Sequence, residues 1–327
     1  GAYKKEPSKG KMEISYTKGD KYAEKRHLLN FTMNHRSGFV NILGRPNVGK
    51  STIMNALVGE KLSIITSKAQ TTRHRIMGIV NGDGFQIVYS DTPGILKPKY
   101  KLQESMMNFV NVALTDADII LYVTDVTGKA GDDTGYSDKI SHSHIPVIVA
   151  VNKIDLTKPG ELEIITAGIK ERFPEAPIVP VSAINGFNLD TLLNAILSYL
   201  PEGEPYFPKD QLTDKYERFF ASEIIREKIF LNYQKEIPYS SEVEIDSFKE
   251  EKDLLRIRAV IHVTRESQKG ILIGHKGEKL KVTGTAARKD MEDFFGRKVF
   301  LELYVKVTKD WRDKPQVLKR FGYRFND

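Results

Sequence analysis

The sequence of 327 residues contains no cysteine and no long hydrophobic run. Without cysteine the chain can form no disulfide framework, no thiolate metal site and no nucleophilic thiol. A bilayer-spanning helix needs about 20 consecutive apolar residues, so we expect no such helix. The N-terminal stretch is rich in lysine and lacks the apolar core of a secretory signal. These absences are typical of the reducing interior of a cell, and they favour a cytoplasmic location.

Positive charge is concentrated at the two ends of the chain. Residues 1–36 carry nine Lys/Arg against four Asp/Glu, residues 37–200 carry 15 against 16, and residues 269–327 carry 15 against 8. A basic excess of this kind is found both on nucleic-acid-binding surfaces and on ordinary solvated faces. Charge alone therefore leaves both interpretations open.

Short apolar runs alternate with helical patterns in the first two thirds of the chain. Near-continuous apolar strands separated by helices predict a mostly parallel sheet with helices on both faces. We therefore expect an α/β domain over residues 37–200, preceded by a flexible polar arm at residues 1–36. The predicted strands are 38–44, 73–80, 85–91, 118–126, 146–155 and 176–183.

The order of the elements changes after residue 200. Residues 201–214 contain three prolines and are predicted to be a linker. Residues 215–308 then show the order helix, strand, strand, helix, helix, strand, which predicts a separate α+β domain. Residues 309–327 form a basic and aromatic tail.

A phosphate-binding motif, GRPNVGKS, occupies residues 44–51, after a predicted strand and at the start of a helix. Glycines let the backbone wrap a polyphosphate, and the helix N-terminus adds positive potential. Lys50 is expected to reach the β- and γ-phosphates, and the Ser51 hydroxyl to ligate Mg²⁺. The motif by itself does not distinguish ATP from GTP.

The sequence NKID at residues 152–155 favours guanine. It ends a predicted strand, where ligands bind in such sheets. The Asp155 carboxylate can accept from both donors on the guanine edge, which adenine does not offer, and an unpaired buried acceptor costs about 1–3 kcal/mol. Asn152 is expected to bridge the base and the phosphate loop, and the Lys153 stem to cover the base. A backbone N–H of Ser182–Ala183 would reach the guanine carbonyl.

Two further polar segments complete the predicted site. DTPG at residues 91–94 supplies Asp91, which would hold Mg²⁺ through water, and Gly94, whose amide would sense the γ-phosphate. QTTR at residues 70–73 lies where a switch loop belongs, with Thr72 as the favoured Mg²⁺ ligand and Thr71 as the alternative. Lys50, Thr72 and Gly94 are the predicted catalytic residues. The predicted nucleotide contacts are Gly44, Arg45, Pro46, Asn47, Val48, Gly49, Lys50, Ser51, Thr52, Thr71, Thr72, Asp91, Thr92, Pro93, Gly94, Asn152, Lys153, Asp155, Ser182 and Ala183.

In this order and spacing, the motifs GRPNVGKS, QTTRHR, DTPGI, NKID and SA resemble those of translation-factor-related GTPases. Followed by a GxxG domain, they resemble the Era family in particular, over about residues 37–327. Ile95 stands where Ras-type enzymes place a water-orienting glutamine, so slow intrinsic hydrolysis is expected. Related GTPases with asparagine at the position of Asn47 bind K⁺ beside the phosphates, which suggests a K⁺ site here.

GILIGHKGEKL at residues 270–280 holds a second pair of close glycines, Gly274 and Gly277. It lacks the Lys-Ser/Thr pair of a nucleotide loop and joins two predicted helices. The arrangement resembles a type II KH domain, which clamps about four nucleotides with the GxxG backbone against the phosphates. Ile271, Leu272, Ile273 and Val282 would form the groove floor or pack in the core. The predicted RNA-binding residues are Ile273, Gly274, His275, Lys276, Gly277, Lys279, Lys281, Arg288 and Lys289.

The resemblance implies a GTP/GDP-binding switch that uses Mg²⁺ and binds the 3′ end of small-subunit ribosomal RNA during assembly of the small ribosomal subunit. It implies a monomer away from the ribosome and a further association with the inner face of the cell membrane. Basic tail residues such as Arg312, Lys319 and Arg320 would extend the RNA surface, whereas Trp311 alone is typical of packing. Two alternatives remain: an RNA-binding module with a structural, non-hydrolysing GTP site, and another translation-related GTPase class.

Overall fold

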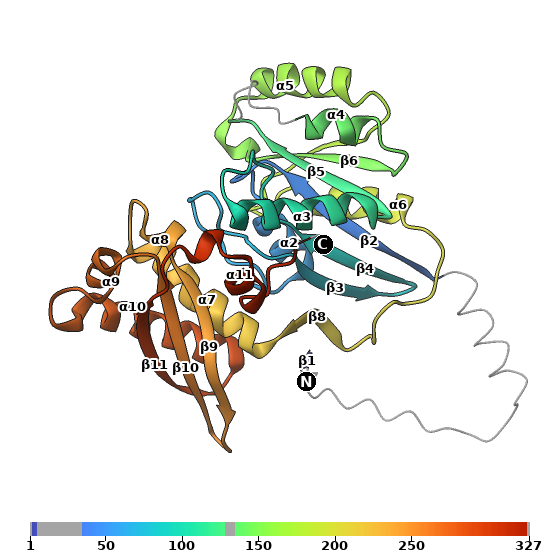
Figure 1. The fold of residues 1–327 in the computed structure, drawn as a ribbon. Coiled ribbons are helices and arrows are strands. Elements are labelled where there is room, and N and C mark those ends of the chain that lie inside the picture. The colour runs from blue at the N-terminus through green and yellow to red at the C-terminus, as the bar shows by residue number, and fades with distance from the viewer. Residues whose placement is uncertain (1, 5–34, 128–134, 326–327) are drawn as a thin grey trace, which may run out of the picture.

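The computed structural model describes residues 2–4, 35–127 and 135–325. Within these residues the chain forms an eight-stranded sheet with flanking helices and a separate three-stranded sheet with its own helices (Figure 1). The predicted arm falls largely outside them, over residues 5–34. In the described parts of the chain, no helix combines the length and the hydropathy needed to cross a membrane.

The large sheet has a parallel centre and antiparallel strands at one edge. Its strand order is β1-β8-β3-β4-β2-β5-β6-β7. The strands from β4 through β2, β5 and β6 to β7 are parallel, whereas β3, β8 and β1 run antiparallel to their neighbours. The prediction of a mostly parallel sheet is therefore confirmed. The strands are β1 (Ala2–Lys4), β2 (Arg36–Gly44), β3 (Ile76–Gly82), β4 (Phe85–Asp91), β5 (Ile119–Asp125), β6 (Val147–Asn152), β7 (Ile178–Pro180) and β8 (Gln211–Tyr216).

Helices cover both faces of this sheet because successive strand residues point to opposite sides. On one face Ile42 and Leu121 pack with helices α2 (Lys50–Val58) and α6 (Leu189–Tyr199). On the other face Leu43 and Ile120 pack with α3 (Lys101–Thr115), α4 (Tyr136–Ser141) and α5 (Pro159–Arg172). This layering brings the carboxyl ends of the parallel strands to one edge.

Two predicted domain boundaries differ from the structure. Strand β8 takes up the last residues of the predicted linker, and its Thr213 pairs with Gly78 of β3. At the other end, β2 begins at Arg36, the last residue of the predicted arm, and His35 Nδ1 hydrogen-bonds Gly203 O at 2.9 Å. The long-range partners of these residues, and not their local sequence, decide both differences.

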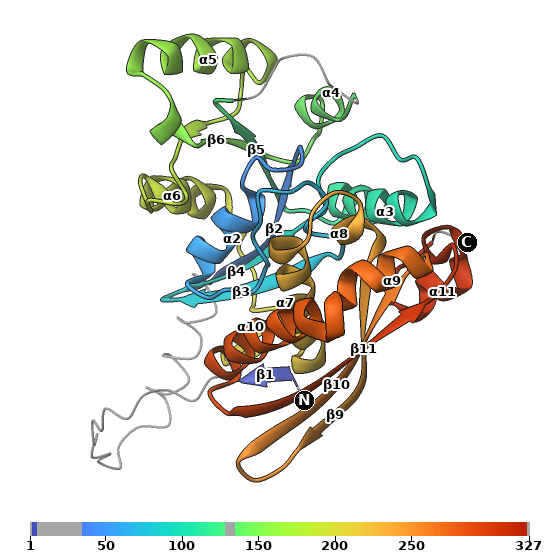
Figure 2. The same cartoon turned by 90° about the vertical axis from the view of Figure 1, so that its left-hand side faces the viewer.

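The second sheet has the order β11-β10-β9, with β10 parallel to β11 and antiparallel to β9. The elements follow the predicted order, with one added short helix α8 (Figure 2). Buried Leu255, Ile257 and Ile261 of β10 pack in one continuous core with Ala287 and Met291 of α10. The elements are α7 (Glu217–Asn232), α8 (Ile237–Ser240), β9 (Glu242–Glu250), β10 (Leu254–Val263), α9 (Glu266–Ile273), α10 (Glu278–Phe295) and β11 (Lys298–Val307).

The described part of the C-terminal tail, residues 309–325, packs against the first domain. It contains the short helices η3 (Trp311–Asp313) and α11 (Pro315–Arg320), close to α3 in Figure 1. Trp311, Leu318 and Tyr323 form a small buried core with Leu102 and Met106 of α3. The tail therefore lies where the two domains meet.

A candidate nucleotide site and a candidate RNA-binding loop

The phosphate loop runs from the end of β2 to the start of α2 and requires glycine on steric grounds. Gly49 has φ 96°, and a Cβ there would lie 2.1 Å from Nδ2 of Asn152. A Cβ on Gly94, in the neighbouring DTPG segment, would lie 2.7 Å from the backbone of Pro46. These close approaches bring three segments distant in sequence around one small space.

Lys50 sits inside this loop. Its Nζ donates to the carbonyls of Gly44 at 3.1 Å and of Arg45 at 2.9 Å. Burial lowers the pKa of Lys50 to about 8, with a smaller opposing contribution from Asp91. An anion in the cradle would favour the charged form, which suits a phosphate-binding lysine.

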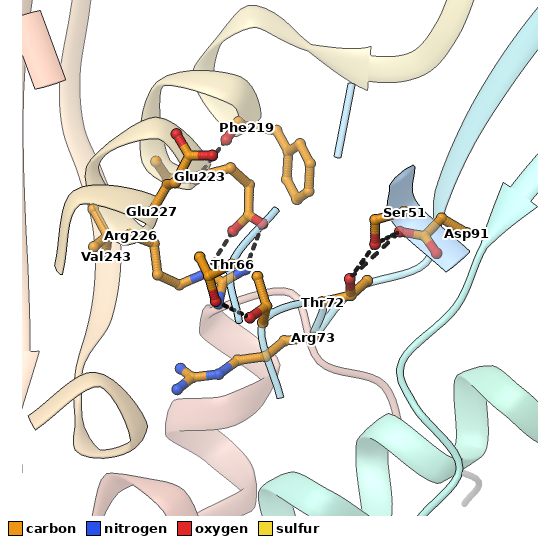
Figure 3. Close-up of polar contacts among 12 residues, drawn as sticks. Ser51, Thr66, Thr72, Arg73, Asp91, Phe219, Glu223, Arg226, Glu227 and Val243 are labelled. Carbon is orange, nitrogen blue, oxygen red and sulfur yellow. Dashed lines mark hydrogen bonds and ion pairs between the residues drawn. The ribbon is translucent and has the colours of Figure 1, made fainter. Parts of the chain in front are cut away.

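The three side-chain oxygens predicted to serve Mg²⁺, from Ser51, Thr72 and Asp91, lie together (Figure 3). The Ser51 hydroxyl donates to Asp91 Oδ2 at 2.6 Å, the Thr72 hydroxyl to the same atom at 3.4 Å, and the two hydroxyl oxygens are 3.0 Å apart. The alternative ligand, Thr71, is turned away, because its Oγ1 lies 2.6 Å from Thr66 Oγ1 and donates to Lys68 O at 2.7 Å. Of the two threonines, the geometry favours Thr72.

The surroundings of Asp91 show whether these residues suit a divalent cation. Its Oδ1 is buried and has no hydrogen-bond partner among the described residues. Burial raises the pKa of Asp91, while Lys50 and the nearby hydroxyls of Ser51, Ser63 and Thr72 oppose the shift. A buried orphan carboxylate oxygen is costly, and hard oxygen donors are what Mg²⁺ prefers. The set fits Mg²⁺.

The predicted base end of the site is a linked group at the ends of β6 and β7. Asn152 Nδ2 donates to Val48 O at 2.9 Å, so the expected bridge to the phosphate loop is present. The Ser182 hydroxyl donates to Asp155 Oδ1 at 2.5 Å. The Ala183 amide donates to Asn152 Oδ1 at 3.0 Å, so this amide already has a partner in place of a guanine carbonyl.

Sequence reasoning missed a residue at this end of the site. Asp125, the last residue of β5, forms an ion pair with Lys153 at 2.5 Å between Oδ2 and Nζ. Lys153, whose stem is predicted to cover the base, has a left-handed backbone with φ 63°. Its position at the carboxyl end of the strand beside β6 was the signal in the sequence that could have identified Asp125 as part of the site.

The structure also gives the surroundings of three further residues named from the sequence, Thr92, Ile95 and Asn47. The Thr92 hydroxyl is buried and donates to Ile42 O at 2.7 Å, so it supports the strand and does not face the cradle. Ile95 is buried in the core beneath α3, and its amide donates to Gly44 O at 3.0 Å. Asn47 has φ 65°, and its Nδ2 donates to Ser67 O at 3.0 Å, which joins the phosphate loop to the switch loop.

The GxxG turn lies between α9 and α10 and is open to solvent. His275 and Lys276 are exposed on a single 3-10 turn, and the α10 N-terminus follows directly. Lys279, Lys281 and Lys289 are also exposed, whereas Arg288 pairs with Glu292 at 3.0 Å. Exposed cations beside a helix N-terminus make a surface suited to phosphate.

The predicted groove floor is only partly accessible. Leu272 is fully buried in the domain core, which settles it as a packing residue, because α9 turns that side of the helix toward the sheet. Ile273 is half-buried, and Ile271 and Val282 are exposed by 43% and 62%. The apolar surface available to a base is therefore formed by Ile271, Ile273 and Val282.

The tail residues make intramolecular contacts instead of a free basic surface. The Trp311 indole is buried and donates to Ser240 O at 3.0 Å. The Arg312 guanidinium lies 4.8 Å from the centre of the Tyr100 ring, and Arg320 pairs with Glu244 at 2.9 Å. These contacts weaken the prediction that the tail extends an RNA surface.

Comparison with known proteins agrees with both parts of the fold. A model described as a 50S ribosome-binding GTPase matches residues 39–153, and a KH-domain model matches residues 236–312. GTPase Era of Syntrophus aciditrophicus is 48% identical over 292 residues, which cover 88% of this chain and 95% of that protein. The chain belongs to the Era family of GTPases. GTPase Era of Geobacter metallireducens is 47% identical over 291 residues, 88% of this chain and 98% of that one.

Two solved Era structures match most of this chain. Era crystallised with MgGDPNP and nucleotides 1506–1542 of 16S ribosomal RNA has a TM-score of 0.85 and 44% identity, covering 89% of this chain and 100% of that one. Era of Aquifex aeolicus bound to GDP·AlF₄⁻, as a point variant, gives the same values. As an Era-family member, this chain combines a P-loop GTPase domain with a C-terminal KH domain.

Proposed function

We propose that this protein is a GTP-hydrolysing switch that binds the 3′ end of 16S ribosomal RNA through its KH domain and acts in small-subunit assembly. One observation carries the proposal. The chain that places Ser51, Thr72 and the orphan Asp91 oxygen beside Lys50 also exposes a GxxG turn, and it is 44% identical to an Era solved with MgGDPNP and 16S RNA.

The chemistry follows from the residues around the cradle. Lys50 and the loop amides would hold the phosphates, and Asp155 would select guanine. Ser51 and Thr72 would ligate Mg²⁺, with Asp91 acting through water; when bound, the ion neutralises charge on the β- and γ-phosphate oxygens. Gly94 would report the γ-phosphate. Ile95 is apolar and buried, so no side chain at that position orients the attacking water, and slow intrinsic turnover follows.

The asparagine of the phosphate loop supports a role for K⁺. Asn47 Nδ2 donates to the Ser67 carbonyl, so its amide already lies beside one carbonyl of the segment that leads into QTTR. K⁺ held there would supply the positive charge that an arginine finger supplies elsewhere. GTP turnover is expected to be faster in K⁺ than in Na⁺ at matched ionic strength, and equal rates would refute this part of the proposal.

The experiment that tests the function is GTP turnover with and without an oligonucleotide of the 16S 3′ end. Turnover that the RNA changes supports the switch, whereas GTP binding with no turnover supports an RNA-binding module with a structural nucleotide. Crosslinking in cells followed by RNA sequencing identifies the bound RNA. For the free protein we propose a cytoplasmic monomer with peripheral membrane association, as the family resemblance implies; sedimentation and cell fractionation measure both.

A further inference from the structure

The switch segment, residues 66–73, connects the nucleotide site to the second domain through two charged side chains. Thr72 contacts Ser51 and Asp91, as described above, and the next residue, Arg73, points the opposite way (Figure 3). Arg73 is completely buried. Its Nη1 donates to Ser241 O at 2.7 Å and to Glu242 Oε2 at 2.8 Å, and its Nη2 donates to Pro238 O at 2.9 Å.

The hydrogen-bond partners of Arg73 lie at the junction of α8 and β9, and the C-terminal tail contacts the same junction. Glu242 Oε2 accepts a second hydrogen bond, from the Tyr323 hydroxyl at 2.7 Å. Burial raises the pKa of Glu242, but Arg73 and Arg226 outweigh it and the pKa is lowered. Removing one partner of such a buried pair leaves an uncompensated charge, which is far more costly than losing a surface pair.

Lys68 is the second anchor of the switch segment. Its Nζ donates to the carbonyls of Phe230 and Tyr233, at the C-terminal end of α7. A cation is favourable there because the last carbonyls of a helix lack internal partners and carry partial negative charge. The Tyr233 hydroxyl in turn donates to Leu272 O at 2.8 Å, in the helix that ends at the GxxG turn.

These two anchors restrict the residues between them. A chain reaches at most about 3.3–3.6 Å per residue, so Thr72 cannot move far while Lys68 and Arg73 both hold the second domain. Movement of α7 or of the α8–β9 junction relative to the first domain must therefore displace Thr72 or break an anchor. The segment thus has contacts to a predicted metal ligand set and to the RNA-binding domain within eight residues.

We propose that Lys68 and Arg73 are positioning residues that couple the placement of Thr72 to the placement of the KH domain. This inference rests on the proposed nucleotide and RNA binding. By linkage, RNA must then change the affinity for a GTP analogue by the same factor by which the analogue changes the affinity for RNA. The two side chains are the physical connection through which that factor arises.

A matched control separates this role from simple stability. Arg75 is also buried, two residues further along, but its partners among the described residues lie in the first domain. Its Nε donates to Ser90 Oγ at 2.6 Å, its Nη2 to Asn41 Oδ1 at 3.0 Å, and it pairs with Asp116. Arg75→Gln therefore removes a buried arginine just beyond the switch segment without touching the domain connection.

The experiment compares Arg73→Gln, Arg73→Lys and Lys68→Met with Arg75→Gln in the full chain. The measurements are thermal unfolding, affinity for GDPNP with and without a 16S 3′ oligonucleotide, and the Mg²⁺ concentration needed for half-maximal GDPNP binding. Coupling factors between sites are typically about 5 to 150. We expect this factor to fall toward one in Arg73→Gln and Lys68→Met, and the Mg²⁺ requirement to rise. Arg73→Lys, which keeps the charge but not the fork of donors, is expected to retain part of the coupling.

Two results would overturn the inference. The first is that the Arg73→Gln and Lys68→Met variants both fold and both keep the wild-type coupling factor. The second is that the Arg75→Gln variant loses as much coupling as the Arg73→Gln and Lys68→Met variants, since the loss would then come from destabilisation of the protein. Lys68→Met keeps the test decisive if Arg73→Gln does not fold, because the partners of Lys68 are backbone carbonyls and no buried charge is left behind. GDPNP is not hydrolysed, so a wild type that couples but does not turn over GTP would count against the proposed enzyme activity alone.

Discussion

The two glycines of the GxxG turn should differ sharply in how they tolerate a side chain. Gly277 has φ 83° and ψ 6°, and a Cβ there would meet no described atom within 4 Å. Gly274 has φ 71° and ψ −177°, and its Cβ would lie 2.8 Å from Cγ and 2.9 Å from Cβ of Lys279. The first conformation is left-handed helical and merely unfavourable for other residues, whereas the second is essentially restricted to glycine.

The magnitudes follow from these conformations. A left-handed residue costs about 1–2 kcal/mol, so Gly277→Ala should lower the free energy of unfolding by about that amount. Gly274→Ala should lose about 1–3 kcal/mol from the backbone alone and more from the clash, because the Cβ of Lys279 is fixed on α10. Chemical denaturation of the two variants measures the difference. Equal stability of the two would refute the backbone argument.

Because Gly277 tolerates a side chain better than Gly274 does, a substitution at Gly277 is the better test of RNA binding. Gly277→Asp adds a carboxylate where phosphates are proposed to lie, and Gly277→Asn adds nearly the same shape without charge; both residue types tolerate left-handed backbone. Affinity for a 16S 3′ oligonucleotide, measured by fluorescence anisotropy, should fall well below wild type in the Asp variant and much less in the Asn variant. If the two variants bind RNA equally well, the phosphates do not approach this turn.

Three further predictions concern titration and base selection. Because Lys50 has a pKa of about 8 in the free protein and phosphate binds its charged form, GTP affinity should fall roughly tenfold from pH 7 to pH 9, measured by calorimetry; a flat profile would mean that Lys50 stays charged. Burial lowers the pKa of His74 to about 4, against attraction by Glu242 and Glu223 and with repulsion from Arg226 and Lys215. The unfolded chain therefore binds more protons between about pH 4 and 6.5, so stability should fall on acidification through that range, and His74→Phe, which keeps a ring against Tyr323, should flatten the fall. Asp155→Asn should weaken GTP binding by roughly 5- to 150-fold through a mismatched guanine edge and improve binding of XTP; unchanged preference would remove Asp155 from base recognition.

Local pattern predicted the parts of the fold that depend on local chemistry. The strand over residues 85–91 is observed with the predicted bounds, because an apolar run buried on both faces needs no distant partner to identify it. The meeting of Ser51, Thr72 and Asp91 was also expected, since a helix start and the carboxyl ends of neighbouring strands lie at one edge of such a sheet. Their hydroxyl and carboxylate oxygens are 2.6–3.4 Å apart.

Features decided by distant partners were not predictable in the same way. Residues 211–214 follow three prolines and three of the four are polar, yet they extend the large sheet because β3 offers a free edge. Leu272 and Ile271 are neighbours of equal hydrophobicity, but only Leu272 is buried. Which of two adjacent apolar residues faces the core depends on how α9 docks against the sheet, and two turns of helix are too short for periodicity to decide.

The connection between the two domains could not be predicted from the sequence either, because it also depends on distant partners. Arg73 lies in a polar stretch, where an arginine is ordinarily solvated, and nothing nearby in the sequence indicates that it is completely buried. Its partners are 165 to 169 residues away, and they can neutralise it only after the second domain has docked. A buried guanidinium without those partners would be prohibitively costly. The domain arrangement that satisfies Arg73 is therefore also the one that holds Thr72 beside Ser51 and Asp91, and any arrangement that moves α8 and β9 away must expose or re-pair Arg73. Its burial makes the nucleotide site sensitive to where the RNA-binding domain lies.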